Sequence, residues 1–120
     1  MIDHVGFEVS DLARSAEFYD AITFPLGVRR VLATDHAVAY GVEGPALWIV
    51  VRGRMPAAGF GHVALEATGR VAVDAAYNAG LAHGGSDDGP PGPRPQYGDG
   101  YYAAYLRDPD GLRVEVVARR

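Results

Sequence analysis

The chain repeats part of its own sequence, and this repeat limits the folds that are open to it. The segment His-Val-Gly-Phe-Glu at residues 4–8 returns as His-Val-Ala-Leu-Glu at residues 62–66, an offset of 58 positions. The same offset carries Tyr19 onto Tyr77. Self-similarity at this period indicates two copies of one supersecondary unit, each of which buries its apolar face with the help of the other.

Each copy has the pattern of a strand, a helix and three strands. Alternation of apolar residues predicts the first strand over residues 2–9, and Ser10-Asp11 provides an N-cap for the helix after it. Near the end of the chain, Asp-Pro-Asp-Gly at residues 108–111 has strong turn chemistry and predicts a hairpin. The remaining predicted strands cover residues 28–33, 36–42, 47–51, 62–66, 101–107 and 112–117, and the second helix covers 71–83.

The second copy is longer than the first. Towards its end the offset grows to 67, which pairs Trp48 with Glu115. The nine extra residues fall within 86–100, a stretch of glycine, proline and aspartate without hydrophobic periodicity. We expect a loop insertion here, and it is a candidate lid over a binding site.

These patterns predict an α+β fold. Two tandem βαβββ modules would form a curved mixed sheet, with the helices outside and a concave sheet surface inside. A length of 120 residues fits one domain over residues 1–120. Within it, module one covers about 1–52, a linker about 53–59 and module two about 60–120.

Composition excludes several classes of function. The chain has no cysteine, so disulfides, thiolate metal sites and a cysteine nucleophile are excluded. Its net charge is −4 and its arginines are scattered along the sequence, which argues against a nucleic-acid partner. No apolar run reaches membrane-spanning length, so we expect no membrane partner and a cytoplasmic location.

The strand faces select candidate metal ligands. The apolar face of the first strand must pack under its helix, so His4 and Glu8 on the other face look into the concavity. The repeat then gives four equivalent inward positions, which hold His4, Trp48, His62 and Glu115. Two imidazoles and one carboxylate suit a divalent ion such as Fe(II), Mn(II), Ni(II) or Zn(II). In the structural alternative, both histidines are ordinary hydrogen-bonded residues and Glu115 pairs with an arginine, Arg113 or Arg107.

Other side chains on the same faces are candidates for catalysis or ligand contact. Glu8 and Glu66 occupy matching strand ends and are candidate acid–base groups, as is Glu115. Trp48 faces the cleft and would form a stacking wall for a planar or apolar ligand. Alternation sets Tyr101 and Tyr105 on one face of the hairpin, and we expect both to contact substrate, whereas Tyr102 lies on the opposite face.

Three motifs carry a resemblance to a known family. They are the opening His-Val-Gly-Phe-Glu-Val-Ser-Asp, the central Gly-His-Val-Ala-Leu and the closing Asp-Pro-Asp-Gly-Leu-Arg-Val-Glu. Together with the duplicated βαβββ pattern, they make the chain resemble the vicinal oxygen chelate (VOC) superfamily. That superfamily includes glyoxalase I, bleomycin-resistance proteins, fosfomycin-resistance transferases and extradiol dioxygenases, and the match extends over essentially the whole chain.

The resemblance implies a metal-dependent lyase, isomerase or dioxygenase whose small substrate chelates the ion through two adjacent oxygens. His4, His62 and Glu115 match the histidine, histidine and glutamate ligands of several members, whereas Trp48 stands where glyoxalase I has a fourth ligand. The alternative is a metal-free protein that binds a small molecule or an antibiotic, as bleomycin-resistance proteins do. The resemblance also implies a homodimer, with the site formed either within one chain or across two.

Overall fold

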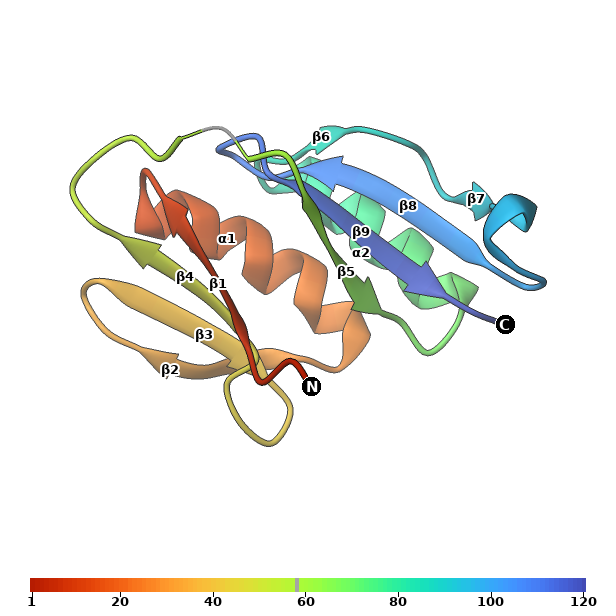
Figure 1. The fold of residues 1–120 in the computed structure, drawn as a ribbon, viewed down its shortest axis with the longest axis horizontal. Helices are drawn as coiled ribbons and strands as arrows, with labels where there is room; N and C mark the ends of the chain where they lie inside the picture. Colours follow the sequence, from red (N-terminus) through yellow and green to blue (C-terminus); the bar gives the residue numbers. More distant parts are fainter. Residues whose placement is uncertain (58) are drawn as a thin grey trace.

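The first module forms one four-stranded sheet with a helix behind it. The computed structural model describes residues 1–57 and 59–120 of the chain. Strand order in the first sheet is β1-β4-β3-β2, with β1 parallel to β4 and the other pairs antiparallel. The elements are β1 (Val5–Val9), α1 (Leu12–Thr23), the 3-10 helix η1 (Phe24–Leu26), β2 (Arg29–Ala33), β3 (Ala37–Gly41) and β4 (Leu47–Val51) (Figure 1).

The second module repeats this plan with one strand divided. Strand order is β5-β9-β8, and the short strands β6 and β7 both pair with the outer edge of β8, where the first module has a single strand, β2. The α+β class is therefore confirmed. The elements are β5 (His62–Glu66), α2 (Arg70–Ala82), β6 (Ser86–Asp87), β7 (Gly92–Pro93), the 3-10 helix η2 (Pro95–Tyr97), β8 (Tyr102–Arg107) and β9 (Arg113–Ala118).

The inserted stretch, residues 86–100, runs along the edge of the second sheet. Besides the pairing of β6 and β7, the Asp88 amide donates to the Tyr105 carbonyl at 2.9 Å, and the Arg94 amide donates to the Tyr101 carbonyl at 2.8 Å. These backbone bonds join the stretch to β8. Its role as a lid remains a prediction. Any lid movement would have to break the backbone hydrogen bonds that join the stretch to β8.

The strand registers confirm the repeat read from the sequence. In the first sheet Gly6 lies opposite Trp48, and in the second Ala64 lies opposite Glu115. Gly6 and Ala64 are 58 positions apart, while Trp48 and Glu115 are 67 apart, as the two offsets require. The parallel pairs β1–β4 and β5–β9 are thus equivalent elements.

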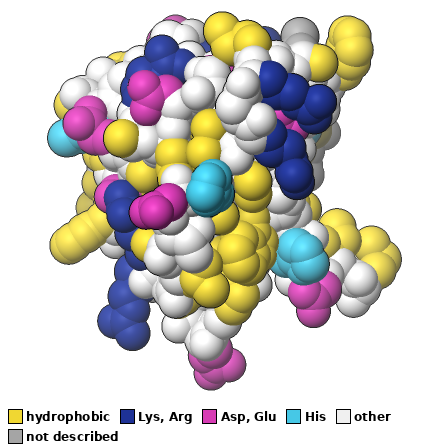
Figure 2. All heavy atoms as spheres, turned by 90° about the vertical axis from the view of Figure 1, so that its left-hand side faces the viewer, with side chains coloured by type: hydrophobic (Ala, Val, Ile, Leu, Met, Phe, Trp, Pro, Cys, Tyr) yellow, Lys and Arg dark blue, Asp and Glu magenta, His cyan; other side chains and the backbone are white. Residues whose placement is uncertain are grey.

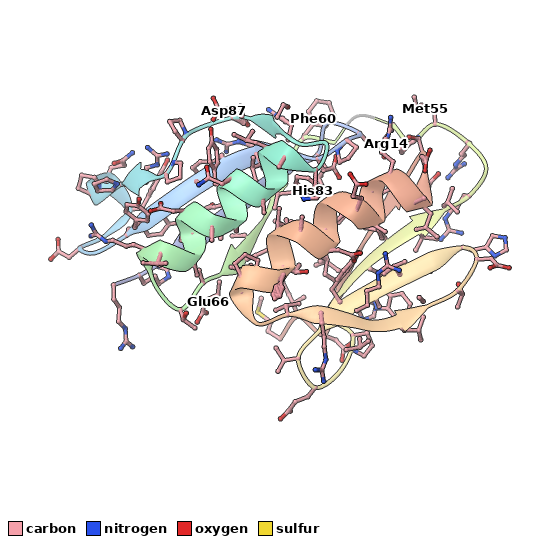
Figure 3. The ribbon with its side chains drawn as sticks, turned by 180° about the vertical axis from the view of Figure 1, so that it is seen from behind. Arg14, Met55, Phe60, Glu66, His83 and Asp87 are labelled. Carbon is pink, nitrogen blue, oxygen red and sulfur yellow. The ribbon has the colours of Figure 1, made fainter. Side chains whose placement is uncertain are left out.

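Both helices cover the same side of the two sheets and leave the other side open (Figures 1 and 3). The Asp11 side chain caps α1 by accepting a hydrogen bond from the Arg14 amide at 3.0 Å, as the sequence predicts. One core cluster joins helices and sheets, and it includes Phe18, Ile22, Val73, Leu106 and Val116. No helix within residues 1–57 and 59–120 is long and apolar enough to cross a membrane.

The turn between β8 and β9 ties the second module to α1 of the first. The Asp108 carboxylate accepts from the amides of Asp110 and Leu112, both at 2.9 Å, and from the Tyr19 hydroxyl at 2.7 Å. Asp110 accepts from the Ser10 amide at 2.9 Å and from the Arg14 guanidinium at 3.1 Å. Asp110 therefore binds the beginning of α1 and Asp108 binds Tyr19 further along the same helix.

Replacing Asp110 by alanine should destabilise the protein by about 1–3 kcal/mol, because the half-buried Ser10 amide loses its acceptor. Urea unfolding of Asp110→Ala measures this change in free energy. The matched control is Asp35→Ala, which alters an exposed aspartate between β2 and β3 and should stay within about 0.5 kcal/mol of the parent. Equal stability of the two variants would contradict the role given to this turn.

Candidate active site

Two predicted ligands meet on the open face of the second sheet. His62 begins β5 and Glu115 lies in the middle of the neighbouring strand β9, and His62 Nε2 is 3.1 Å from Glu115 Oε1. The Glu115 side chain is 3% exposed, whereas the His62 side chain is 43% exposed. The carboxylate is therefore held inside the protein, and the imidazole forms the accessible part of the pair.

Tyr101 holds the other oxygen of the same carboxylate. Its hydroxyl donates a hydrogen bond to Glu115 Oε2, and this bond raises the pKa of Tyr101 to about 12. Burial raises the pKa of Tyr105, with a further contribution from the negative charge of Glu115. Tyr101 and Tyr105 thus lie on the same face of the sheet as Glu115. Tyr102 packs against the core on the other face, as alternation predicts.

The geometry of the pair suits two ligands of one ion. Ligand atoms about 2.1 Å from a divalent metal and at a right angle to each other lie about 3.0 Å apart. The 3.1 Å between His62 Nε2 and Glu115 Oε1 agrees with this separation. The hydrogen bond from Tyr101 to the second carboxylate oxygen is the kind of outer contact that orients a metal-binding carboxylate.

His4, the third predicted ligand, does not join this pair within one chain. Its Nδ1 lies 2.6 Å from the carboxylate of its neighbour Asp3, and its side chain is 55% exposed. Among the described residues, no three histidine, aspartate or glutamate side chains come together in a group that could hold a metal. A ligand set of His4, His62 and Glu115 would therefore need a second chain.

The arginines suggested as alternative partners of Glu115 contact a different carboxylate. Arg113 Nε lies 2.8 Å from Asp88 Oδ2, and Arg107 Nε lies 3.2 Å from the same oxygen. The side-chain partners of Glu115 are His62 and Tyr101 instead. Burial of this carboxylate is thus compensated by hydrogen bonds rather than by a direct arginine ion pair.

Trp48 lies on the open face of the first sheet, between Gly6 and Ala39 in the strand register. It is half-buried, whereas its neighbours along β4, Leu47 and Ile49, point into the core. Hydrophobic side chains form a band on the side of the molecule that carries this sheet (Figure 2). The first module therefore has an indole where the second has the carboxylate of the polar pair.

The two other predicted acid–base glutamates lie apart from each other. Glu8 binds Arg54 through both carboxylate oxygens at 2.6 and 3.1 Å, and this interaction lowers the pKa of Glu8. Glu66 is exposed at the other end of β5 from His62, and Figure 3 shows it on the opposite edge of the molecule from Met55 and Phe60. A lowered pKa makes Glu8 a weaker base, so a base role is better suited to a group without such a partner.

A cleft of about 610 Å³ lies between the modules and reaches His62. Its walls are largely apolar, and it also borders the Glu8–Arg54 ion pair. A second cleft of about 400 Å³ lies at the Glu66 end of β5. The lining residues of the first cleft include Phe7, Glu8, Arg54, Met55, His62 and Leu112.

Sequence reasoning did not find the bond between Tyr101 and Glu115. Alternation placed both residues on one face, but Tyr101 precedes β8 and lies four residues before Tyr105, the residue that pairs with Glu115 in the ladder. Only the side-chain conformation of Tyr101 brings its hydroxyl back to Glu115. The shared face was the available signal, and it suggested substrate contact rather than support of the carboxylate.

Comparison with known proteins identifies the family. The profile of the Glyoxalase/Bleomycin resistance protein/Dioxygenase superfamily matches residues 1–116, so the chain belongs to this VOC superfamily. No curated protein sequence matches the chain.

Solved structures of the superfamily share the fold over nearly the whole chain. A glyoxalase/bleomycin resistance protein from Albidiferax ferrireducens is 33% identical, with a TM-score of 0.82, and the match covers 95% of this chain and 94% of that one. The fosfomycin resistance protein FosX of Mesorhizobium loti is 19% identical (TM-score 0.71, 98% and 91% covered). A lactoylglutathione lyase of Agrobacterium tumefaciens is 23% identical (0.68, 98% and 92%). At these last two identities the likeness shows the fold alone.

Replacing Glu115 by glutamine should lower the pKa of Tyr101 from about 12 towards 10, because the neutral amide no longer disfavours the phenolate. NMR of ring-labelled tyrosine in the presence of a chelator measures this titration. Glu66→Gln is the control, since Glu66 lies at the exposed end of β5, and it should leave the Tyr101 curve unchanged. A Tyr101 pKa that is the same in Glu115→Gln and the parent would show that the carboxylate does not control this hydroxyl.

Proposed function

We propose that the protein is a divalent-metal-dependent VOC enzyme of the lyase, isomerase or dioxygenase type. Its substrate would be a small molecule that binds the ion through two adjacent oxygens. The observation that carries this proposal is the His62–Glu115 pair, whose 3.1 Å separation suits neighbouring ligands of one ion. Fe(II), Mn(II), Ni(II) and Zn(II) all accept this combination of nitrogen and oxygen donors.

The third ligand in this proposal is His4 of a second copy of the chain. His4 occupies the position of module one that His62 occupies in module two, and its exposed side chain is available to a partner. A two-fold dimer would bring module one of each copy over module two of the other and would form two equal sites. It would also cover the apolar face around Trp48, which is unusual on a monomer.

The chain's own residues would orient the site and exclude water from it. Tyr101 would hold Glu115 in one orientation, and the buried position of Glu115 would keep it from solvent. Trp48 of the partner would form an apolar wall against the substrate. The bound ion would supply Lewis-acid stabilisation of negative charge on the substrate oxygens.

One observation favours a second candidate, a metal-free small-molecule binder. Both oxygens of Glu115 already have hydrogen-bond partners, His62 and Tyr101, within one chain. A carboxylate whose oxygens both have hydrogen-bond partners does not require a cation, and the largely apolar cleft that reaches His62 suits ligand capture. The metal titration below separates the two candidates.

Metal binding is the first test. In isothermal titration, the parent protein should take up about one Mn(II), Fe(II), Ni(II) or Zn(II) ion per chain, with a rise in melting temperature. Glu115→Gln should weaken binding about tenfold or more, since it keeps the shape but removes the anionic ligand. Glu66→Gln is the matched control and should bind as the parent does. Absence of uptake by the parent would leave the metal-free binder as the better candidate.

The oligomeric state is the second test. Light scattering at micromolar concentration should give twice the chain mass of 12.7 kDa. The reason is that a dimer would cover the apolar band of the first sheet. It would also complete the ligand set on the second sheet. A mass equal to one chain at this concentration would contradict the dimeric site.

A further inference from the structure

Positive charge gathers on the open face of the second sheet, although the whole chain has a net charge of −4. The guanidinium groups of Arg113 and Arg94 lie 4.0 and 5.7 Å from the centre of the Tyr105 ring, and that of Arg119 lies 5.1 Å from the Tyr101 ring. Arg107 contacts the same aspartate as Arg113. We call these four residues the arginine cluster: Arg94, Arg107, Arg113 and Arg119.

The acidic groups beside the arginine cluster do not balance it. Asp88 offers one carboxylate oxygen to both Arg107 and Arg113, and Glu115 is bound to His62 and Tyr101. Among the described residues, the ion pairs of the cluster are those that Arg107 and Arg113 make with this one aspartate. The cluster therefore has more positive charge than its ion pairs neutralise, and a surface of one charge attracts ligands of the opposite charge.

Arg113 is the member of the cluster best placed to bind a ligand. Its plane lies over the Tyr105 ring at 4.0 Å, and its Nε donates to Asp88 at 2.8 Å, so the group is fixed from two directions. Within residues 1–57 and 59–120, this Nε bond is the one hydrogen bond that its side chain makes. Its terminal amino groups therefore remain free, and the side chain is 35% exposed.

Tyr105 is covered by these guanidinium groups rather than open to a ligand. It is 8% exposed, and Arg113 and Arg94 both lie over its ring. A ligand on this face would therefore contact the planar guanidinium of Arg113. The sequence had suggested contact with the ring of Tyr105 instead. Arginine offers a fixed fork of N–H donors that matches a carboxylate with two parallel hydrogen bonds.

Arg113 also lies next to the His62–Glu115 pair. It faces His62 across the β5–β9 ladder, and it precedes Glu115 by two residues on the same face of β9, a distance of about 7 Å along the strand. We propose that Arg113 binds an oxyanion of the ligand, so that the natural ligand is a small organic acid, with its carboxylate on Arg113 and its remaining polar atoms towards His62. This proposal rests on the proposed function in one respect: both place the ligand on the open face of the second sheet.

The test uses benzoate and its neutral isostere benzamide on the full chain, with a chelator present. NMR titration should show saturable binding of benzoate, with the largest shifts at Arg113 and its strand neighbours, and much weaker binding of benzamide. Arg113→Gln should weaken benzoate binding about tenfold or more, because a charged hydrogen-bond pair is lost. Arg30→Gln is the matched control: it removes an exposed arginine paired with Asp20 elsewhere and changes net charge equally.

A second variant separates lost recognition from lost structure. Arg113→Lys keeps the charge but not the fork, so it should bind benzoate less tightly than the parent and more tightly than Arg113→Gln. Equal binding of benzoate and benzamide, no saturable binding of benzoate, or unchanged affinity in Arg113→Gln would each overturn the proposal. Because the titration is done without metal, failure of metal uptake would not affect this result.

Discussion

The turn between β8 and β9 depends on Asp108 and Asp110, whose carboxylates accept hydrogen bonds from their own turn and from α1. Asp108 closes the turn, and Asp110 attaches it to the beginning of α1. This arrangement fixes where β9 starts, and a shift of one residue in β9 would turn Glu115 from the open face into the core. The same turn therefore contributes to the contact between the modules and sets the position of the buried carboxylate.

The two copies of the unit have the same strand register but different side chains at equivalent positions of their open faces. At equivalent positions the first sheet has Trp48 and the second has Glu115, opposite Gly6 and Ala64 respectively. The open face of the first sheet consequently has Trp48 at this position, with the Glu8–Arg54 ion pair on the same face, while the second sheet carries a buried carboxylate with histidine, tyrosine and arginine around it. Two surfaces of this kind are complementary in a two-fold pairing, since each copy offers both.

Much of the fold could be predicted because the sequence contains two copies of the same unit. The two offsets predict the βαβββ units and the pairs Gly6–Trp48 and Ala64–Glu115, and alternation places Tyr101 on the face of Glu115. What strand periodicity does not contain is the placement of one sheet relative to the other. It therefore left open whether His4 meets His62 and Glu115 within one chain or across two, and among the described residues of one chain His4 contacts Asp3. The division of residues 86–100 into two short strands depends on contacts with β8 that no local pattern encodes.

In the proposed site, His62 and Glu115 of one chain share a metal ion with His4 of another. The sharpest test mixes two variants that should each bind metal weakly, His4→Ala and His62→Ala, after dissociation and reassociation. In a mixed dimer, one site has His62 and Glu115 from the first variant and His4 from the second, while the other site lacks both histidines. Metal titration of the mixture should therefore recover tight sites that neither variant shows alone, at about one per mixed dimer. A mixture that binds no more metal than the separate variants would contradict the account.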